Sequence, residues 1–329
     1  MTLIKSNSGI RGTIGGFPGD NLTPLDVVKY ASAYGVWLKS RSKGTIKVVV
    51  GRDARISGLI VQNLVESSLQ SLGINVIDIG LSTTPTVEIA VPIEKASGGI
   101  ILTASHNPKQ WNALKLLNEK GEFVSAKDGN EILRIAEKEN FEYTNVDDLG
   151  TSVQKDYLHE HINAILNLTS VDVDVIKSSK FKVVVDAVNS SGGIYLPALL
   201  EAMGVEVVKL YCEPTGEFPH NPEPLPEHLH DLCSLVTESK ADLGFVVDPD
   251  VDRLAIVSED GSLFGEEYTL VAVADYILQL KKGNTVSNLS STRALYDVSK
   301  IHGVNYFASA VGEVNVVEKM KEVDAVIGG

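Results

Sequence analysis

The sequence predicts an α/β protein of three consecutive domains with mixed, largely parallel sheets, the third of them incomplete. Three stretches share one layout, at residues 46–80, 181–211 and 284–312. Each has a run rich in β-branched residues, a polar loop, a helix-like segment, a glycine and a second apolar run. A helix that connects two such apolar runs is typical of parallel β-α-β units. Composition agrees, because aromatic residues make up only 6% of the chain, and Val, Ile and Leu suit buried parallel strands.

A glycine closes the helix-like segment in each stretch. Gly73, Gly204 and Gly303 are expected to end their helices in the left-handed conformation. The stretches recur at domain-sized intervals, whereas the repeats of a solenoid recur about every 20 to 50 residues. Three related domains would explain the repetition, but any α/β protein repeats this layout for physical reasons, and the pattern alone favours neither explanation.

Polar segments divide the chain into these domains. The acidic stretch 137–150 predicts a linker, which gives a first domain at residues 1–150. A turn followed by a helix start at 258–269 predicts the second boundary, which gives domains at 151–259 and 260–329. The Pro-rich stretch 212–229 lacks periodicity and predicts a long loop, a feature that is often functional in compact domains. The sequence ends in an apolar run and two glycines, so the third domain is expected to be incomplete.

Charge and composition restrict the function classes. A net charge of -14 argues against nucleic acid or an anionic membrane as the partner, although an acidic protein can have a basic cleft for a phosphorylated substrate. Cys212 and Cys233 lack the spacing of a zinc site and are expected to be reduced thiols. The N-terminal sequence lacks the apolar core of a secretory signal, and no apolar run is long enough to span a membrane. We therefore expect a cytoplasmic protein.

Three aspartates give the clearest chemical signal. Asp248, Asp250 and Asp252 follow an apolar strand and precede another. Carboxylates this close repel one another unless a cation neutralises them, and hard oxygen ligands on a loop suit Mg²⁺ or Ca²⁺. The alternative is a solvated acidic turn, which the buried flanking strands disfavour. An EF-hand is also disfavoured, because Arg253 occupies the position of the loop glycine and the flanks are strands.

Ser105 lies in a turn at the end of another predicted strand. The Gly-x-Ser-x-Gly pattern of hydrolase nucleophiles is absent, and His106 is too close in sequence to be expected as its base. Asn107-Pro108 predicts a turn that leaves Ser105 exposed and unpaired. Such a serine suits a carrier of a phosphoryl group, and the alternative is an ordinary turn or helix-cap serine.

Several cations are predicted at strand ends, where α/β folds bind ligands. Arg11 lies in a Gly-rich segment, and Arg52 and Arg55 follow a predicted strand. Together with Lys115 and Arg253 they are typical of a phosphate site.

Four motifs together resemble those of the α-D-phosphohexomutase family, the phosphoglucomutase, phosphomannomutase and phosphoglucosamine mutase group. The motifs occur in the family's order, at Ser8–Gly12, Gly51–Asp53, Thr103–Pro108 and Asp248–Arg253. The resemblance covers the whole chain. It implies that the three repeated stretches belong to related domains, and that a fourth domain and a sugar-selecting loop, expected just after Gly329, are absent here.

The resemblance also implies roles for individual residues. Ser105 is similar to the phosphoserine of the family and, with Asp248, Asp250 and Asp252, to its Mg²⁺ site. The remaining expected catalytic residues are Arg11, Lys115 and Arg253, with Lys115 as a candidate acid or base. The residues expected to bind substrate phosphate are Arg11, His106, Lys115 and Arg253.

The implied reaction is reversible phosphoryl transfer between a hexose 1-phosphate and a hexose 6-phosphate through a bisphosphorylated sugar, in a monomer or homodimer. The substrate could be glucose, mannose or glucosamine phosphate, and Val311-Gly312-Glu313 resembles phosphoglucosamine mutases or archaeal-type mutases. Without the fourth domain, this chain is expected to be an impaired mutase. Two alternatives remain: a non-catalytic sugar-phosphate-binding protein and a metal-dependent phosphatase.

Overall fold

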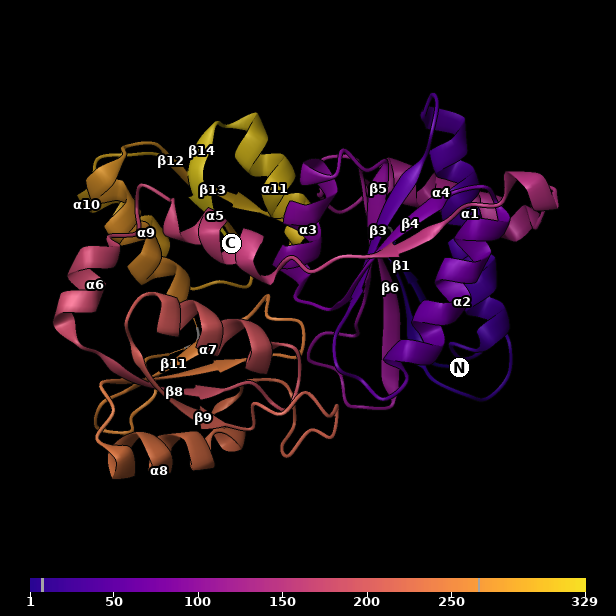
Figure 1. Ribbon diagram of the computed structural model, residues 1–329. Coiled ribbons are helices and arrows are strands. Elements are labelled where there is room, and N and C mark those ends of the chain that lie inside the picture. Colours follow the sequence, from indigo (N-terminus) through magenta and orange to yellow (C-terminus); the bar gives the residue numbers. More distant parts are fainter. Residues whose placement is uncertain (7–8, 266) are drawn as a thin grey trace.

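The computed structural model describes residues 1–6, 9–265 and 267–329, and it confirms three α/β domains. Figure 1 shows the first domain at the right, the second at the lower left and the third at the upper left. In the described residues the three domains contain sheets of seven, four and three strands. Within these ranges, none of the helices combines the length and apolar composition needed to cross a membrane.

The first sheet is mixed. Its strands, in spatial order, are β1 (Ile4–Ser6), β2 (Gly9–Thr13), β6 (Trp111–Leu117), β5 (Gly98–Leu102), β3 (Lys47–Arg52), β4 (Asn75–Leu81) and β7 (Ser152–Gln154). Strand β3 pairs in parallel with β4 and β5, whereas β6 runs antiparallel to β2 and β5. Strands β5 and β6 are therefore neighbours, and each leads to or from the turn that contains Ser105.

Alternating side chains of β3 build two hydrophobic layers, as the period of a strand requires. Val48 and Val50 pack in the core formed with α1 (Pro24–Arg41), α2 (Gly58–Ser71) and α4 (Ala126–Lys138). Val49 packs in a separate core on the other face, which is covered by α3 (Thr84–Ile93). Burial on both faces explains why these strands are continuous apolar runs in the sequence.

The second sheet has the strand order β11 (Leu254–Ser258), β10 (Leu243–Val247), β8 (Lys182–Asp186) and β9 (Glu206–Leu210). Helix α7 (Gly192–Ala202) covers one face and α8 (His230–Ser239) covers the other. Two further helices, α5 (Leu158–Leu166) and α6 (Val173–Ser179), precede this sheet, and α5 contacts both α3 and α7. The long loop expected at 212–229 is present, apart from the short helical turn η2 (Pro226–His228).

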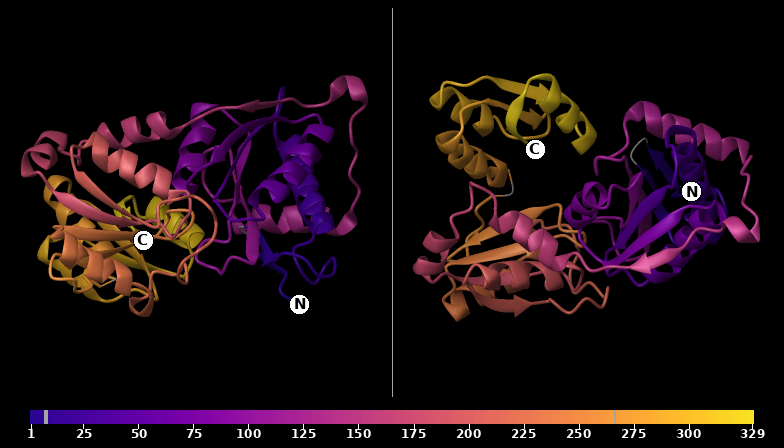
Figure 2. Two further views of the ribbon diagram at one scale, coloured as in Figure 1. Left: turned by 60° about the horizontal axis from the view of Figure 1, so that its bottom comes forward. Right: turned by 45° about the horizontal axis from the view of Figure 1, so that its top comes forward.

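The third sheet is parallel and has the order β13 (Tyr306–Ser309), β12 (Asn284–Asn288) and β14 (Ala325–Gly328). Its helices are α9 (Tyr268–Leu280), α10 (Ala294–Ile301) and α11 (Glu313–Glu322). Figure 2 shows α11, in yellow, on the side of this domain that faces the first domain. Lys321 of α11 pairs with Glu122 of the first domain at 2.6 Å, an exposed ion pair between the two domains.

The three glycines end their helices as expected. Gly73, Gly204 and Gly303 have φ angles of 76°, 78° and 67°. In each case the next amide reaches back to a carbonyl of the last helical turn, as Ile74 does to Leu69 at 3.1 Å. These are the hydrogen bonds of a Schellman cap, so the repeated layout includes its termination signal.

The sheets continue slightly beyond the expected boundaries. Strand β7 pairs in parallel with β4, so the first sheet extends to Gln154 rather than ending before residue 150. The turn η1 (Val146–Asp148) lies in the connection before it. Similarly, the amide of Phe264 donates to the carbonyl of Ile256 at 2.9 Å, and the second sheet is extended past residue 259. A three-residue edge strand has too few residues to produce a recognisable pattern.

Candidate functional site

The loops after β5 and β10 meet at the contact between the first two domains. The hydroxyl of Ser105 donates to Oδ2 of Asp248 at 2.6 Å, although the two residues are 143 positions apart. Ser105 is only 8% exposed. The expectation of an exposed, unpaired serine is therefore wrong, because the aspartate loop of the second domain covers it.

Ser105 has an unusual backbone and a histidine neighbour. Its φ angle is 49°, in the left-handed region that few residues other than glycine adopt. The Nδ1 atom of His106 lies 3.4 Å from its hydroxyl oxygen. Burial, with the positive charges of Arg253 and Arg11, lowers the pKa of His106, so its imidazole is neutral at pH 7.

The three aspartates converge on one point. Oxygen atoms from Asp248, Asp250 and Asp252 all lie within 4.8 Å of one another. The Oδ1 atom of Asp250 is buried and has no hydrogen-bond partner in the described part of the chain. A buried carboxylate oxygen without a partner is costly, and a hard divalent cation would supply the missing interaction. The residues present therefore fit a Mg²⁺ ion.

The crowding of the carboxylates affects their protonation. Burial and the neighbouring carboxylates raise the pKa of Asp248, and burial together with Asp250 raises that of Asp252. Burial opposes ionisation of Asp250 as well, but Lys115 outweighs it and lowers the pKa of that carboxyl. A cluster with such opposed shifts needs positive charge to hold all three groups ionised.

Lys115, on β6, supplies part of that charge. Its Nζ atom lies 2.7 Å from Oδ2 of Asp250 and 2.9 Å from Oδ2 of Asp252. Burial disfavours the ammonium form, but the two carboxylates outweigh burial and raise the pKa of Lys115 above its usual value. Lys115 is thus held as an ammonium ion at neutral pH.

The other expected cations lie around this cluster. Arg11 donates to Oδ1 of Asn107 at 3.1 Å, which holds it against the serine loop. The side chain of Arg253 is 43% exposed and lies 3.8 Å from Glu223 of the long loop 212–229. Ser8 of the first motif lies outside the described residues. The structure therefore brings Arg11, His106 and Arg253 to the rim of the aspartate cluster.

Arg52 and Arg55 do not join the expected phosphate site. The side chain of Arg55 is fully buried and donates to main-chain carbonyls of the serine loop, including that of Pro108 at 2.7 Å. Arg52 donates to Gln62 at 2.9 Å and to a main-chain carbonyl. The expectation fails because the turn after β3 lies beneath the serine loop rather than at its open side.

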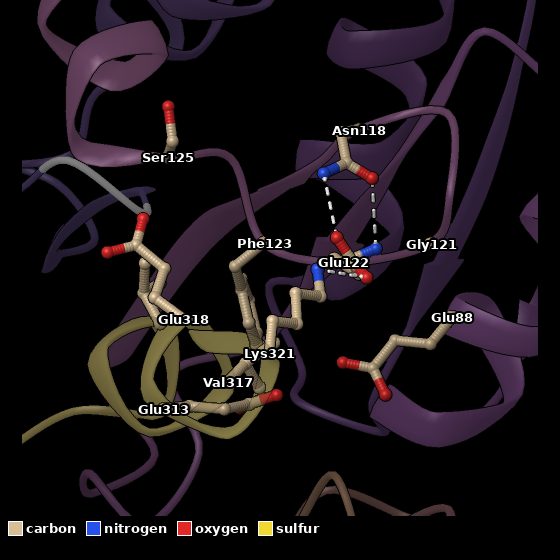
Figure 3. Close-up of a pocket in the computed structure, with 11 residues that line it drawn as sticks. Glu88, Asn118, Gly121, Glu122, Phe123, Ser125, Glu313, Val317, Glu318 and Lys321 are labelled. Atoms are coloured by element: carbon tan, nitrogen blue, oxygen red, sulfur yellow. Dashed lines mark hydrogen bonds and ion pairs between the residues drawn. The ribbon is translucent and has the colours of Figure 1, made fainter. Parts of the chain in front are cut away.

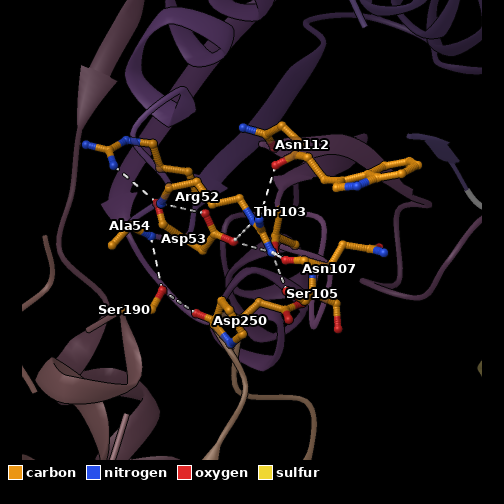
Figure 4. Close-up of polar contacts among 12 residues, drawn as sticks. Arg52, Asp53, Ala54, Thr103, Ser105, Asn107, Asn112, Ser190 and Asp250 are labelled. Carbon is orange, nitrogen blue, oxygen red and sulfur yellow. Dashed lines mark hydrogen bonds and ion pairs between the residues drawn. The ribbon is translucent and has the colours of Figure 1, made fainter. Parts of the chain in front are cut away.

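Two residues that were not expected tie the domains together. Thr84, at the start of α3, donates from its amide and its hydroxyl to Asp250. Ser190 accepts from the amide of Ala54 at 3.2 Å and donates to the carbonyl of Pro249 at 2.7 Å (Figure 4). In the sequence, Thr84 has the pattern of a helix start and Ser190 that of a polar loop, so neither carried a chemical signal.

A cavity of about 330 Å³ lies between the first and third domains (Figure 3). Its lining includes Glu88 of α3 and Glu313 of α11, whose carboxylates point toward each other. Burial and Glu313 raise the pKa of Glu88 to about 8. Partial desolvation in the cleft and the charge of Asp252 raise the pKa of Glu313 to about 7. The third domain thus adds acidic groups beside the aspartate cluster.

Comparisons with known proteins match one and the same family in all three domains. The family models described as Phosphoglucomutase/phosphomannomutase, alpha/beta/alpha domains I, II and III, match residues 3–143, 159–261 and 265–329. A Phosphoglucomutase/phosphomannomutase of Thermococcus kodakarensis is 34% identical over 322 residues, which are 97% of this chain and 70% of the relative. A Probable phosphoglucosamine mutase of Methanopyrus kandleri is 35% identical and covers 98% of this chain and 69% of the relative.

Among solved structures, a Phosphoglucomutase/phosphomannomutase family protein from Burkholderia thailandensis superposes with a TM-score of 0.84 at 26% identity. The match covers 99% of this chain and 71% of that one. The similarity therefore extends to the arrangement of all three domains.

Proposed function

The chain belongs to the α-D-phosphohexomutase family, and on that premise we propose that it transfers a phosphoryl group reversibly between the 1- and 6-positions of a hexose. It would act as an intramolecular phosphotransferase of the isomerase class. The observation that supports the proposal is the contact of Ser105 with Asp248, beside an oxygen of Asp250 that has no hydrogen-bond partner among the described residues. In this proposal that hydroxyl is the nucleophile, at the edge of carboxylates that would hold a divalent cation.

In this proposal Ser105 carries the phosphoryl group. Phospho-Ser105 transfers it to the free hydroxyl of a hexose monophosphate, and the product is a bisphosphorylated sugar. That sugar reorients in the cleft and returns its other phosphoryl group to Ser105, so that no phosphate is released. A sugar bisphosphate would accordingly prime an unphosphorylated chain.

The residues around Ser105 have distinct tasks in this scheme. Asp248, Asp250 and Asp252, together with Ser105, would hold Mg²⁺. When bound, Mg²⁺ would polarise the phosphoryl oxygens and offset their charge. Phosphoryl transfer depends mainly on such positioning and charge stabilisation.

The cations complete the proposed site. Lys115 stays protonated between two carboxylates, so it can stabilise negative charge, and its raised pKa makes it a weak general acid and unavailable as a base. Arg11, His106 and Arg253 lie where they could hold the phosphate group that is not reacting. The proposed domains at 1–150 and 151–259 would then contribute the serine and metal loops, and the domain at 260–329 would contribute Glu313.

The identity of the sugar is also part of the proposal. The relatives include proteins named for glucose, mannose and glucosamine phosphates. The Val311-Gly312-Glu313 segment favours the phosphoglucosamine or archaeal-type mutases as the nearest functional group. We propose that the substrate is a hexose phosphate, with these three sugars as the candidates. We also propose that the protein is cytoplasmic.

The test is a turnover assay followed by ³¹P NMR. The purified chain with Mg²⁺ and a trace of glucose 1,6-bisphosphate would receive glucose, mannose or glucosamine 1-phosphate. Formation of the 6-phosphate isomer without inorganic phosphate, lost in Ser105→Ala, is the expected result. Net phosphate release would instead identify a phosphatase, and tight binding without turnover would identify a sugar-phosphate-binding protein. Intact-mass analysis after priming would separately detect a phosphoryl group on Ser105.

A further inference from the structure

A buried carboxylate lies at the base of the serine loop. The side chain of Asp53, just after β3, is fully buried. Its Oδ2 atom accepts from Nε of Arg55 at 3.0 Å and from the hydroxyl of Thr103 at 2.6 Å. Figure 4 shows Asp53, Thr103 and Ser105 close together in one group of polar contacts. One carboxylate therefore fixes two donors that come from the ends of β3 and β5.

Both of these donors also reach the main chain of Ser105. The amide of Ser105 donates to Oγ1 of Thr103 at 2.9 Å. The carbonyl of Ser105 accepts from Nη2 of Arg55. Because the Thr103 hydroxyl donates its hydrogen to Asp53, its oxygen is free to accept from Ser105. The amide and the carbonyl of Ser105 are thus both held by groups anchored on Asp53.

Arg55 also holds the rest of the loop. Its guanidinium donates to the carbonyls of Asn107 at 2.6 Å, Pro108 at 2.7 Å and Trp111 at 3.1 Å. The planar fork of an arginine can make such a set of bonds, whereas a lysine cannot reproduce its geometry. The ring of Phe218 lies 5.1 Å from the guanidinium and covers it with the long loop of the second domain.

Ser105 needs this support because of its backbone. A serine in the left-handed region is strained, and such strain persists only where the surroundings enforce it. We propose that Asp53, Arg55 and Thr103 are positioning residues that hold Ser105 in this conformation and so aim its hydroxyl at Asp248. The role of Ser105 in transfer rests on the proposed function, whereas the support of its backbone does not.

The same turn also sets the distance to the aspartate loop. Ala54 lies between Asp53 and Arg55, and its amide donates to Ser190, which in turn donates to Pro249 within that loop. The turn at 53–55 therefore contacts the serine loop through side chains and is linked to the aspartate loop through the hydroxyl of Ser190. The serine loop and the aspartate loop are therefore both held by the short segment 53–55.

Thr103→Val and Thr103→Ser form the matched pair that tests this. Valine keeps the shape but removes both hydrogen bonds, while serine keeps the hydroxyl. Thr103→Val is expected to lower kcat about 10- to 100-fold with KM and Mg²⁺ affinity changed less than about threefold. Thr103→Ser should restore kcat to near that of the unaltered chain. Arg55→Lys, which keeps the charge beside Asp53, should resemble Thr103→Val.

A loss of general stability would give a different pattern. Leu69→Ala, on the buried face of α2, should lower the melting temperature and the active fraction but leave kcat per phosphorylatable site unchanged. If Arg55→Lys does not fold, Thr103→Val and Thr103→Ser still test the positioning role. A kcat of Thr103→Val within twofold of the unaltered chain, or no recovery in Thr103→Ser, would overturn the positioning role.

Hydrogen exchange supplies a readout that does not need turnover. The amides of residues 104–107 should exchange at least about tenfold faster in Thr103→Val than in the unaltered chain or Thr103→Ser. If the unaltered chain shows no mutase activity, the proposed function fails, and the exchange result still tests the positioning role. Unchanged exchange in Thr103→Val would reject the positioning role even in an active mutase.

Discussion

Thr84 and Asp250 lie 166 residues apart, yet the Thr84 hydroxyl donates to Oδ2 of Asp250 at 2.5 Å. The amide of Thr84 also donates to the carbonyl of Asp250 at 2.8 Å. The first residue of helix α3, in the first domain, is therefore hydrogen-bonded to the aspartate loop of the second domain. This relationship orients the carboxylate of Asp250, whose other oxygen has no hydrogen-bond partner among the described residues.

The first prediction is that Thr84→Val weakens both domain docking and metal binding. A hydrogen bond to a charged group contributes about 1.5–3 kcal/mol, so the unfolding free energy should fall by about 2 kcal/mol. Denaturant unfolding and Mg²⁺ titration by calorimetry measure the two effects. Thr84→Ser, which keeps the hydroxyl, serves as the control. If valine and serine behave alike, the hydroxyl contact contributes nothing.

The second prediction concerns the metal. Mg²⁺ at 100 times its Kd should raise the free energy of unfolding by about 2.7 kcal/mol, because it binds only the folded cluster. Chelation with EDTA should reverse the rise and abolish turnover while circular dichroism shows that the fold persists. Asp250→Asn should remove the stabilisation by Mg²⁺, and Asp297→Asn, on exposed α10, should keep it. An equal Mg²⁺ effect in both variants would locate the ion elsewhere.

The third prediction is that Lys115→Gln destabilises the metal-free chain by about 3 kcal/mol, since it leaves the buried carboxylate of Asp250 and the partly exposed carboxylate of Asp252 without their cation. Saturating Mg²⁺ should recover part of this loss. The raised pKa of Lys115 means that its contribution is complete below its usual pKa and disappears only as the pH rises through the higher value. The difference should therefore be constant between pH 6 and pH 9 in urea unfolding. Lys120→Gln, on the exposed hairpin, should have no effect.

The fourth prediction concerns Glu88. Its folded-state pKa of about 8 exceeds that of an unfolded glutamate, so the folded protein binds more protons between these two values. Stability should accordingly fall as the pH rises from about 4.5 to 8. Glu88→Gln should be stabilising at pH 8.5, on the order of 1 kcal/mol after allowance for solvent screening, and neutral near pH 4.

Urea unfolding at the two pH values checks this prediction, with Glu142→Gln as an exposed control. A Glu88→Gln effect independent of pH would contradict the assignment of the raised pKa to this carboxyl. An effect of equal size in Glu142→Gln would point to net charge rather than to the facing pair of Glu88 and Glu313.

Most of the fold could be predicted from local sequence patterns. The repeated layout and its closing glycines were predictable because strand period and helix termination depend on neighbouring residues. The short strand β7 was not, because three exposed residues give no period. The convergence of Asp248, Asp250 and Asp252 followed from their spacing on one loop, and the resemblance to a family placed Ser105 near them.

The position and burial of individual arginines could not be predicted in the same way. Arg11 has the glycine-rich surroundings of a loop but lies on strand β2 and reaches the rim, whereas Arg55, in the turn after β3, is completely buried. Burial of Ser105 likewise depends on how the second domain docks on the first. These properties arise from contacts between residues 50 or more positions apart, for which a single sequence contains no local signal.

The contact between Ser105 and Asp248 also has a consequence for the order of events during protein synthesis. A ribosome adds roughly 5–20 residues per second, so the 143 residues between them take on the order of ten seconds to make. During that interval the first domain can fold around Asp53 and Arg55 with its serine loop already shaped. The nascent chain nevertheless has no aspartate loop beside Ser105, and the hydroxyl of Ser105 has no contact with Asp248 until the second domain has emerged and folded.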